Sequence, residues 1–206
     1  MLDIFSAGRR RVVLSLLALG LIGNSAQAAT VGQPAPDFAL KDLNGKTVQL
    51  ADFRGKTVVL EWHNPGCPFV QKHYDSANMP NLQRKQANDV VWLAINSTHV
   101  GHSDHRDAAG YASYMKEKGA ERIPYLLDPD GKTGKAYGAV TTPHMYIIGT
   151  TGQLIYTGAI DSIRSANPAD IPKATNHVAV ALDELKAGKP ISKASTTPYG
   201  CSVKYK

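Results

Sequence analysis

Two continuous apolar runs mark the first half of the chain. They read KTVVLEW at 56–62 and DVVWLAIN at 89–96, and such runs are typical of strands covered on both faces. Upstream, the stretch APDFALKDLNGKTVQLADFRG alternates apolar and polar residues around Asn44-Gly45. This dipeptide predicts a β-hairpin with a tight turn in which both central residues have positive φ.

Helical and strand patterns then alternate toward the C-terminus. A turn at 64–66 precedes a helix that starts at Pro68, runs through Tyr74 and is interrupted near Pro80. The other predicted elements are a helix at 108–119, a strand at 123–128, a short helix at 133–137, a hairpin of strands at 144–149 and 153–160, and a helix at 176–190. This order predicts an α/β sandwich with a mixed sheet.

The two ends of the chain differ from this pattern. Three arginines at 9–11, an apolar run at 12–22 and the small residues Ala26 and Ala28 predict a signal peptide over 1–28, cleaved after Ala28. An uncleaved anchor or a buried helix is the alternative, and the paired arginines leave the export route open. We therefore expect a periplasmic or secreted protein with a domain at 29–190. Residues 191–206 show no periodicity and are predicted to be a flexible tail carrying Cys201.

Charge adds little to this picture. The net charge is +6, and the Lys and Arg residues downstream of the predicted signal peptide are scattered and form no run of like charges. We expect ordinary solubility and no nucleic-acid partner. No second long apolar run is present, so we expect no stable membrane insertion after cleavage.

The chain has two cysteines, Cys67 and Cys201. In an oxidising compartment they allow one internal bridge, which is either a structural staple or a redox pair. Cys67 is expected at the N-cap of the helix that begins with Pro68. The N–H groups of Phe69 and Val70 would then point at its sulfur, and these groups and the helix dipole would favour a thiolate that attacks a disulfide or a peroxide.

Three segments carry a family resemblance. APDFAL, the W-x4-CPF turn and TTPHMYIIGTTGQLIYTG, in this order between about 31 and 188, resemble the thioredoxin-like superfamily, specifically its redoxin (AhpC/TSA-like) branch. The resemblance implies a three-layer α/β sandwich with a central mixed sheet and an N-terminal β-hairpin. It also implies that Pro143 is cis and lies beside Cys67, and that Thr142 offers backbone groups to an extended substrate.

The chain departs from its relatives at two points. Thioredoxins carry Cys-x-x-Cys, but Val70 occupies the second cysteine position here. Peroxiredoxins carry Pro-x-x-x-Thr-x-x-Cys, but Leu60 and Asn64 stand at the Pro and Thr positions. The missing hydroxyl weakens a peroxidase hypothesis. Cys201 is left as the internal candidate to resolve a bond on Cys67, with the permanent staple as the alternative.

Residues around Cys67 supply further candidates. Glu61 would be a desolvated acid–base group with a raised pKa, or else an outward-facing strand residue. His63 is a second candidate base. The resemblance implies that Trp62 packs against the site, where Pro68 would also contact the substrate. Lys72 and His73 are expected on a solvated helix face.

A metal-binding hypothesis is also open. His99, His102 and His105 are spaced three apart, yet exposed histidines often cluster in polar loops, which we favour here. Copper held by His63, Cys67 and His144 is an alternative. The leading hypothesis is an exported thiol–disulfide oxidoreductase without a cofactor, acting on protein or small-molecule thiols and disulfides. A thiol peroxidase acting on peroxide and a non-catalytic disulfide-stapled domain remain alternatives.

Overall fold

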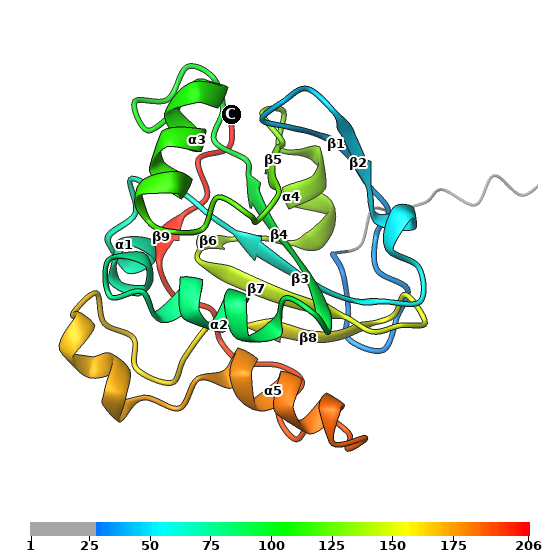
Figure 1. Ribbon diagram of the computed structural model, residues 1–206. Helices are drawn as coiled ribbons and strands as arrows, with labels where there is room; N and C mark the ends of the chain where they lie inside the picture. The colour runs from blue at the N-terminus through cyan, green and yellow to red at the C-terminus, as the bar shows by residue number, and fades with distance from the viewer. Residues whose placement is uncertain (1–27) are drawn as a thin grey trace, which may run out of the picture.

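The computed structural model describes residues 28–206, which are built around a seven-stranded mixed sheet (Figure 1). The strand order is β2-β1-β5-β4-β3-β7-β8. β3 pairs parallel with β4 and β4 with β5, and the other pairings are antiparallel. The strands are β1 (Ala39–Asp42), β2 (Thr47–Gln49), β3 (Thr57–Trp62), β4 (Val90–Asn96), β5 (Tyr125–Leu127), β7 (His144–Ile148) and β8 (Leu154–Gly158).

Helices lie on both faces of the sheet and make the three layers that the family resemblance implied (Figure 1). One core lies between the sheet and α1, α2, α3 and α5, and the other lies under α4. The helices are α1 (Pro68–Asp75), α2 (Asn78–Gln86), α3 (Ala108–Glu117), α4 (Lys132–Tyr137) and α5 (His177–Lys186), with short 3-10 helices η1 (Leu50–Phe53) and η2 (Pro168–Lys173).

The β1–β2 hairpin is confirmed, but the predicted turn is wrong. Gly45 has a φ of 78°, whereas Asn44 is outside the positive-φ region. The side chain of Asp42 accepts hydrogen bonds from the N–H groups of Asn44 and Lys46, both at 2.9 Å. Because this carboxylate organises a longer loop, only one residue needs the left-handed conformation.

The predicted interruption of the first helix is also confirmed, although it lies before Pro80. α1 ends at Asp75, and Ala77 has a φ of 56° immediately before α2. Pro80 is the third residue of α2. Its missing N–H costs nothing there, because the first N–H groups of a helix have no acceptor within the helix.

The parallel pairing of β3 and β4 determines where the loops meet. The two strands are in register from Thr57 opposite Val90 to Trp62 opposite Ile95. Their carboxyl ends therefore lie at one edge of the sheet. Cys67 follows β3 at this edge, and the histidine-containing loop follows β4.

The C-terminal segment is not the flexible tail that its composition predicted. It contains β9 (Cys201–Ser202), which pairs antiparallel with β6 (Thr141–Thr142). Tyr199 and Val203, on either side of β9, are buried. Figure 1 shows this segment running from α5 past α1 to an end near α3. Its order depends on pairing with residues distant in sequence, which leaves no periodic signal.

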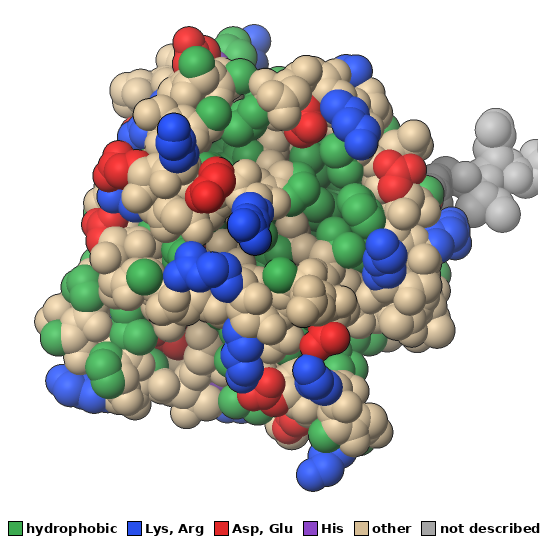
Figure 2. Space-filling view, in the orientation of Figure 1, with side chains coloured by type: hydrophobic (Ala, Val, Ile, Leu, Met, Phe, Trp, Pro, Cys, Tyr) green, Lys and Arg blue, Asp and Glu red, His purple; other side chains and the backbone are tan. Residues whose placement is uncertain are grey.

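The surface agrees with the scattered charges of the sequence. On the face drawn in Figure 2, basic and acidic side chains are interspersed. Within residues 28–206 no helix is both long and apolar enough to span a bilayer. Apart from Ala28, the predicted signal peptide lies outside the described residues.

Candidate functional site

Cys67 lies at the junction of a tight turn and α1. The Asn64 side chain accepts a hydrogen bond from the N–H of Gly66 at 2.8 Å and donates one to Asp104 at 2.9 Å. A Cβ at Gly66 would lie 3.0 Å from the Asp104 carboxyl carbon, so this turn leaves little room for a side chain. Cys67 is the N-cap of α1 and Pro68 opens the helix, as predicted.

The Cys67 sulfur faces the prolyl loop. The Thr142–Pro143 bond is cis, which confirms the expectation drawn from the resemblance. The Cys67 thiol donates a hydrogen bond to the carbonyl oxygen of Thr142 at 2.9 Å. The residue is only 1% exposed.

The predicted hydrogen bonds from helix N–H groups to this sulfur are wrong. No side-chain capping bond reaches the Cys67 sulfur. The N–H groups of Val70 and Gln71 both donate to the backbone carbonyl of Cys67, each at 2.9 Å. The backbone thus caps its own helix, and the sulfur turns toward Thr142 instead.

Cys201 lies next to Cys67 because β9 pairs with β6. Thr142 is the register partner of Cys201, so one residue of the prolyl loop contacts both cysteines. Both are free thiols, and Cys201 packs against the hydrophobic core cluster that contains Cys67. Burial, with a smaller effect of the neighbouring Cys67, raises the pKa of the Cys201 thiol to about 12. Cys201 therefore holds its proton at neutral pH.

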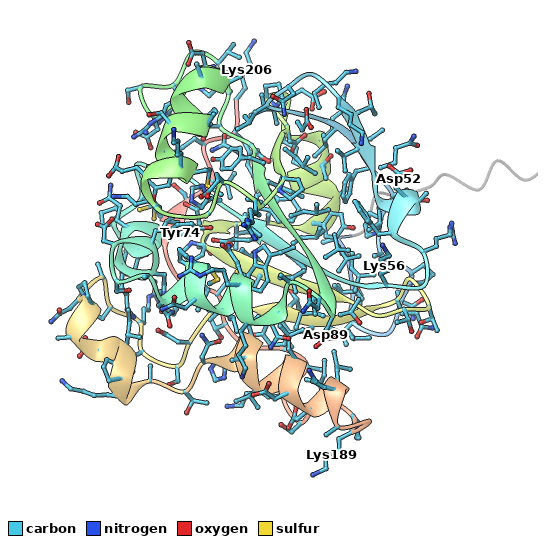
Figure 3. The ribbon with its side chains drawn as sticks, viewed as in Figure 1. Asp52, Lys56, Tyr74, Asp89, Lys189 and Lys206 are labelled. Atoms are coloured by element: carbon cyan, nitrogen blue, oxygen red, sulfur yellow. The ribbon has the colours of Figure 1, made fainter. Side chains whose placement is uncertain are left out.

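Glu61 is fully buried in the core that also contains Cys67. Its Oε2 accepts hydrogen bonds from the indole of Trp92 at 2.9 Å and from Gln83 at 3.3 Å. Gln83 also donates to the hydroxyl of Tyr74, which is labelled on α1 in Figure 3. Desolvation outweighs these bonds and raises the pKa of Glu61 to about 7. The predicted raised pKa is confirmed, and the outward-facing alternative is wrong.

His63 is surrounded by tyrosine rings on the side of the sheet that Glu61 faces. Its ring packs against those of Tyr74, Tyr114 and Tyr125, and its Nδ1 is 3.0 Å from the Tyr125 hydroxyl. Burial, and to a lesser extent the charge of Arg106, lowers the pKa of His63 to about 3. The imidazole is therefore neutral across the physiological range.

Comparison with known proteins identifies the family at this point. The AhpC/TSA family model matches residues 31–157, which is more than half of the chain. This chain belongs to the AhpC/TSA family. Among its relatives, thiol-disulfide oxidoreductase ResA of Geobacillus thermodenitrificans is 29% identical over 165 residues, covering 73% of this chain and 87% of ResA. The thioredoxin-like protein YneN of Bacillus subtilis is 30% identical over 131 residues, covering 63% and 72% of the two chains.

Solved structures with the same fold are also found. An uncharacterized conserved protein from Geobacillus kaustophilus matches with a TM-score of 0.73 and 28% identity, covering 86% of this chain and 93% of that one. A hypothetical protein from Sinorhizobium meliloti matches with a TM-score of 0.72 and 25% identity, covering 87% and 97%. Both alignments span nearly the whole described part of this AhpC/TSA protein.

Trp62 is not part of the Cys67 environment in this AhpC/TSA protein. It lies in the core on the opposite face of the sheet, where its ring packs against Tyr137 and Tyr146. Its indole donates to the hydroxyl of Ser97 at 3.0 Å. The expected packing against the site is therefore wrong. Neighbouring strand residues point to opposite faces, so Glu61 and Trp62 cannot both face Cys67.

The histidines do not assemble into a metal centre in the described part of the chain. There, no group of three or more His, Cys, Asp or Glu side chains is arranged to hold a metal ion. The rings of His99 and His102 are 5.9 Å apart, and Nδ1 of each accepts a backbone N–H bond within the loop. His105 is half-buried, and its buried Nδ1 has no partner among these residues. His144 packs on Tyr146, and burial lowers its pKa to about 4.

Lys72 and His73 form a buried polar cluster that sequence reasoning missed. Both side chains are 0% exposed, so the expected solvated face is wrong. Lys72 pairs with the carboxylate of Asp161 at 3.0 Å, and the hydroxyl of Tyr199 donates to the same carboxylate. Burial lowers the pKa of His73 to about 4, which leaves it neutral. Asp161 and Tyr199 lie far from Lys72 in sequence, so no local pattern announces the cluster.

Proposed function

We propose that this AhpC/TSA-family protein is an exported thiol–disulfide oxidoreductase whose redox centre is the Cys67–Cys201 pair. The observation that carries the proposal is that both cysteines lie against Thr142: the Cys67 thiol donates to its carbonyl oxygen, and Cys201 is its partner in the β6–β9 pairing. The name of the ResA relatives supports the reaction class. The substrates would be thiols and disulfides of proteins or small molecules.

The proposed reaction exchanges two electrons and two protons. The reduced pair converts a substrate disulfide into two thiols and itself becomes the Cys67–Cys201 disulfide, and the reverse reaction oxidises two substrate thiols. An external dithiol or disulfide of suitable potential completes the cycle. Thr142 contributes the carbonyl that orients the Cys67 thiol and the backbone edge that holds Cys201. Pro68, exposed at the start of α1, borders the site.

Glu61 is proposed as the acid–base group. Its pKa of about 7 means that both protonation states are populated near neutral pH, which suits proton transfer. His63, with a pKa of about 3, is neutral and is proposed to shape the pocket around Glu61 and Tyr74 rather than to carry charge.

Export rests on the predicted signal peptide. The described fold supports the predicted cleavage point, because the N–H of Ala29 already bonds to the carbonyl of Ala136 at 3.0 Å. An oxidising compartment would allow the cysteine pair to cycle or to persist as a disulfide.

The test compares wild type with Cys67→Ser and Cys201→Ser in a disulfide-reduction assay driven by dithiothreitol. Wild type is expected to be active, and both variants are expected to lose most of the activity because neither can close the internal bond. Unchanged activity in Cys67→Ser would contradict the proposal. Redox titration tests the staple alternative, since structural disulfides have potentials below about −300 mV. A Cys67–Cys201 potential in that range would favour the staple.

A further inference from the structure

The tail is anchored before it reaches Cys201. Tyr199 is 4% exposed, and its hydroxyl donates to Asp161. Asp161 in turn pairs with the buried Lys72 on α1, the helix that begins at Cys67. We call Lys72, Asp161 and Tyr199 the tail clamp. The clamp ties the segment before Cys201 to the helix of Cys67.

The tail is also anchored beyond Cys201. The N–H of Val203 bonds to the carbonyl of Val140 at 3.2 Å, and the carbonyl of Lys204 accepts from the N–H of His99 at 3.0 Å. The hydroxyl of Tyr205 donates to the carbonyl of Ala139 at 2.7 Å. The chain is therefore anchored both before and after Cys201, so this cysteine does not lie on a flexible segment.

Gly200 places the tail backbone directly on the prolyl loop. Its φ is 148°, and a Cβ at this position would lie 2.0 Å from the carbonyl oxygen of Thr142. Only glycine permits such an approach. With β9 already paired to Thr141 and Thr142, the backbone edge that an extended peptide would use at this loop is occupied by the chain itself.

The two cysteine residues consequently differ in their exposure to solvent. Cys67 is 1% exposed beneath the tail, whereas Cys201 is partly exposed. A thiolate attacks one sulfur of a disulfide along the axis of the S–S bond. The rate of exchange therefore depends on which of the two sulfurs a partner can reach. From outside, that sulfur belongs to Cys201.

We propose that Cys201 carries the mixed disulfide with the external partner and that Cys67 makes and breaks the internal bond. This is the reverse of the order that the sequence suggested, and it rests on the proposed Cys67–Cys201 redox pair. The partner is a thiol or disulfide whose sulfur approaches Cys201 directly and whose backbone does not pair with β6.

The internal disulfide oxidises two partner thiols in two exchange steps. A partner thiolate attacks the Cys201 sulfur of the internal disulfide, and Cys67 leaves as a thiolate. A second partner thiolate attacks the partner's sulfur in the mixed disulfide, which releases a partner disulfide and the Cys201 thiolate. Each released thiolate takes up a proton, so two partner thiols are oxidised and the enzyme pair is reduced. In the reductive direction, Cys201 loses its proton and attacks a partner disulfide, which releases the first partner thiolate. The Cys67 thiolate then attacks the Cys201 sulfur, expels the second partner thiolate and closes the internal disulfide, and the two released thiolates take up the two protons.

Glutathione is the probe for the test. Oxidised wild-type protein is mixed with excess reduced glutathione and quenched in acid, and its peptides are mapped by mass spectrometry. Glutathione is expected on Cys201 in about tenfold or greater excess over Cys67, because the rate of thiolate attack on a disulfide depends on access to the attacked sulfur. Glutathione mainly on Cys67 would overturn this inference and leave the proposed redox pair standing. Failure of the oxidised protein to form any Cys67–Cys201 bond would overturn both.

Gly200→Ala provides the second measurement. The added methyl group collides with Thr142 and should lift the tail, so glutathione should then also appear on Cys67. Gly152→Ala is the matched control, since Gly152 has a φ of 84° but no atom within 4 Å of an added Cβ. It should keep the wild-type distribution. Glutathione confined to Cys201 in Gly200→Ala would show that the tail does not shield Cys67, which would also overturn the inference.

Discussion

At the residue scale, the core that contains Cys67 accommodates two ionisable side chains in different ways. Glu61 has only neutral donors around it, Trp92 and Gln83, so burial favours its protonated form. Lys72 has a carboxylate partner, Asp161, at 3.0 Å. Burying a charge is costly unless it is neutralised or paired, and one core uses both solutions. Glu61 is thus poised to exchange a proton, whereas Lys72 is structural.

Replacing Glu61 should change how stability depends on pH. The raised pKa means that the folded state holds the proton between pH 4.5 and about 7 while the unfolded state releases it. Wild-type stability should therefore be highest below pH 4.5 and should fall by about 3 kcal/mol relative to Glu61→Gln as the pH rises to 7. Urea denaturation at several pH values measures this, and parallel curves for the two proteins would contradict it.

Removing the Lys72 charge should be strongly destabilising. Lys72→Met leaves Asp161 buried without its cation, and the expected loss in the free energy of unfolding is about 3–5 kcal/mol. Lys85→Met is the matched control, because the side chains of Lys85 and its partner Asp183 are 64% and 56% exposed. That pair should contribute at most about 1 kcal/mol. Equal losses in urea denaturation would refute the distinction.

At the scale of elements, α1 and the C-terminal tail are joined twice. One connection is made through Thr142, which contacts both Cys67 and Cys201, and the other is the tail clamp. The clamp acts before any covalent bond exists, so it keeps the sulfurs together in the reduced protein. Such preorganisation raises the effective concentration of one thiol at the other.

Tyr199→Phe should therefore loosen the tail selectively. The variant keeps the ring that packs against Phe69 but loses the hydroxyl bonded to Asp161. Amide hydrogen exchange at 200–203 is expected to speed up about tenfold, since a hydrogen bond to a charged group is worth about 1.5–3 kcal/mol. Tyr137→Phe is the control, because its ring also lies in a core but its hydroxyl bonds to the carbonyl of Pro36 and not to Asp161. Equal acceleration at 200–203 in both variants would count against the clamp.

At the scale of the whole molecule, the Cys67–Cys201 bond would link residues that are distant in sequence but already adjacent in the fold. Oxidation should raise the free energy of unfolding by up to about 5 kcal/mol, because it restricts the unfolded chain over a loop longer than ~100 residues. Urea denaturation of the oxidised and reduced proteins tests this. Cys201→Ser should show no difference between the two conditions, and an oxidised wild type no more stable than the reduced form would contradict the prediction.

Local patterns in the sequence predicted much of this architecture. The apolar runs of β3 and β4, the β7–β8 hairpin and the helix start at Cys67-Pro68 each carry a signal within a few residues. The cis bond before Pro143 was anticipated from the family resemblance, and the raised pKa of Glu61 from its apolar strand. Strand alternation also held the information needed to exclude Trp62 from the site.

Long-range partners account for what the sequence could not predict. The sequence around Lys72 predicts a surface residue, because its partner Asp161 lies 89 positions away. No local helical pattern indicates that the two residues pair. The tail reads as disordered because its order comes from β6, Gly158 and the prolyl loop rather than from itself. The predicted bonds from helix N–H groups to the Cys67 sulfur are absent because the thiol donates to the carbonyl of Thr142 instead.

The long stretch of chain between Cys67 and β9 has a consequence for biosynthesis. A polypeptide that emerges from the ribosome or a translocation channel N-terminus first presents Cys67 long before Cys201 exists outside. During that interval the nascent chain has a lone thiol and an open prolyl edge, both able to engage the wrong partner. A premature stop upstream of β9 would make that transient state permanent.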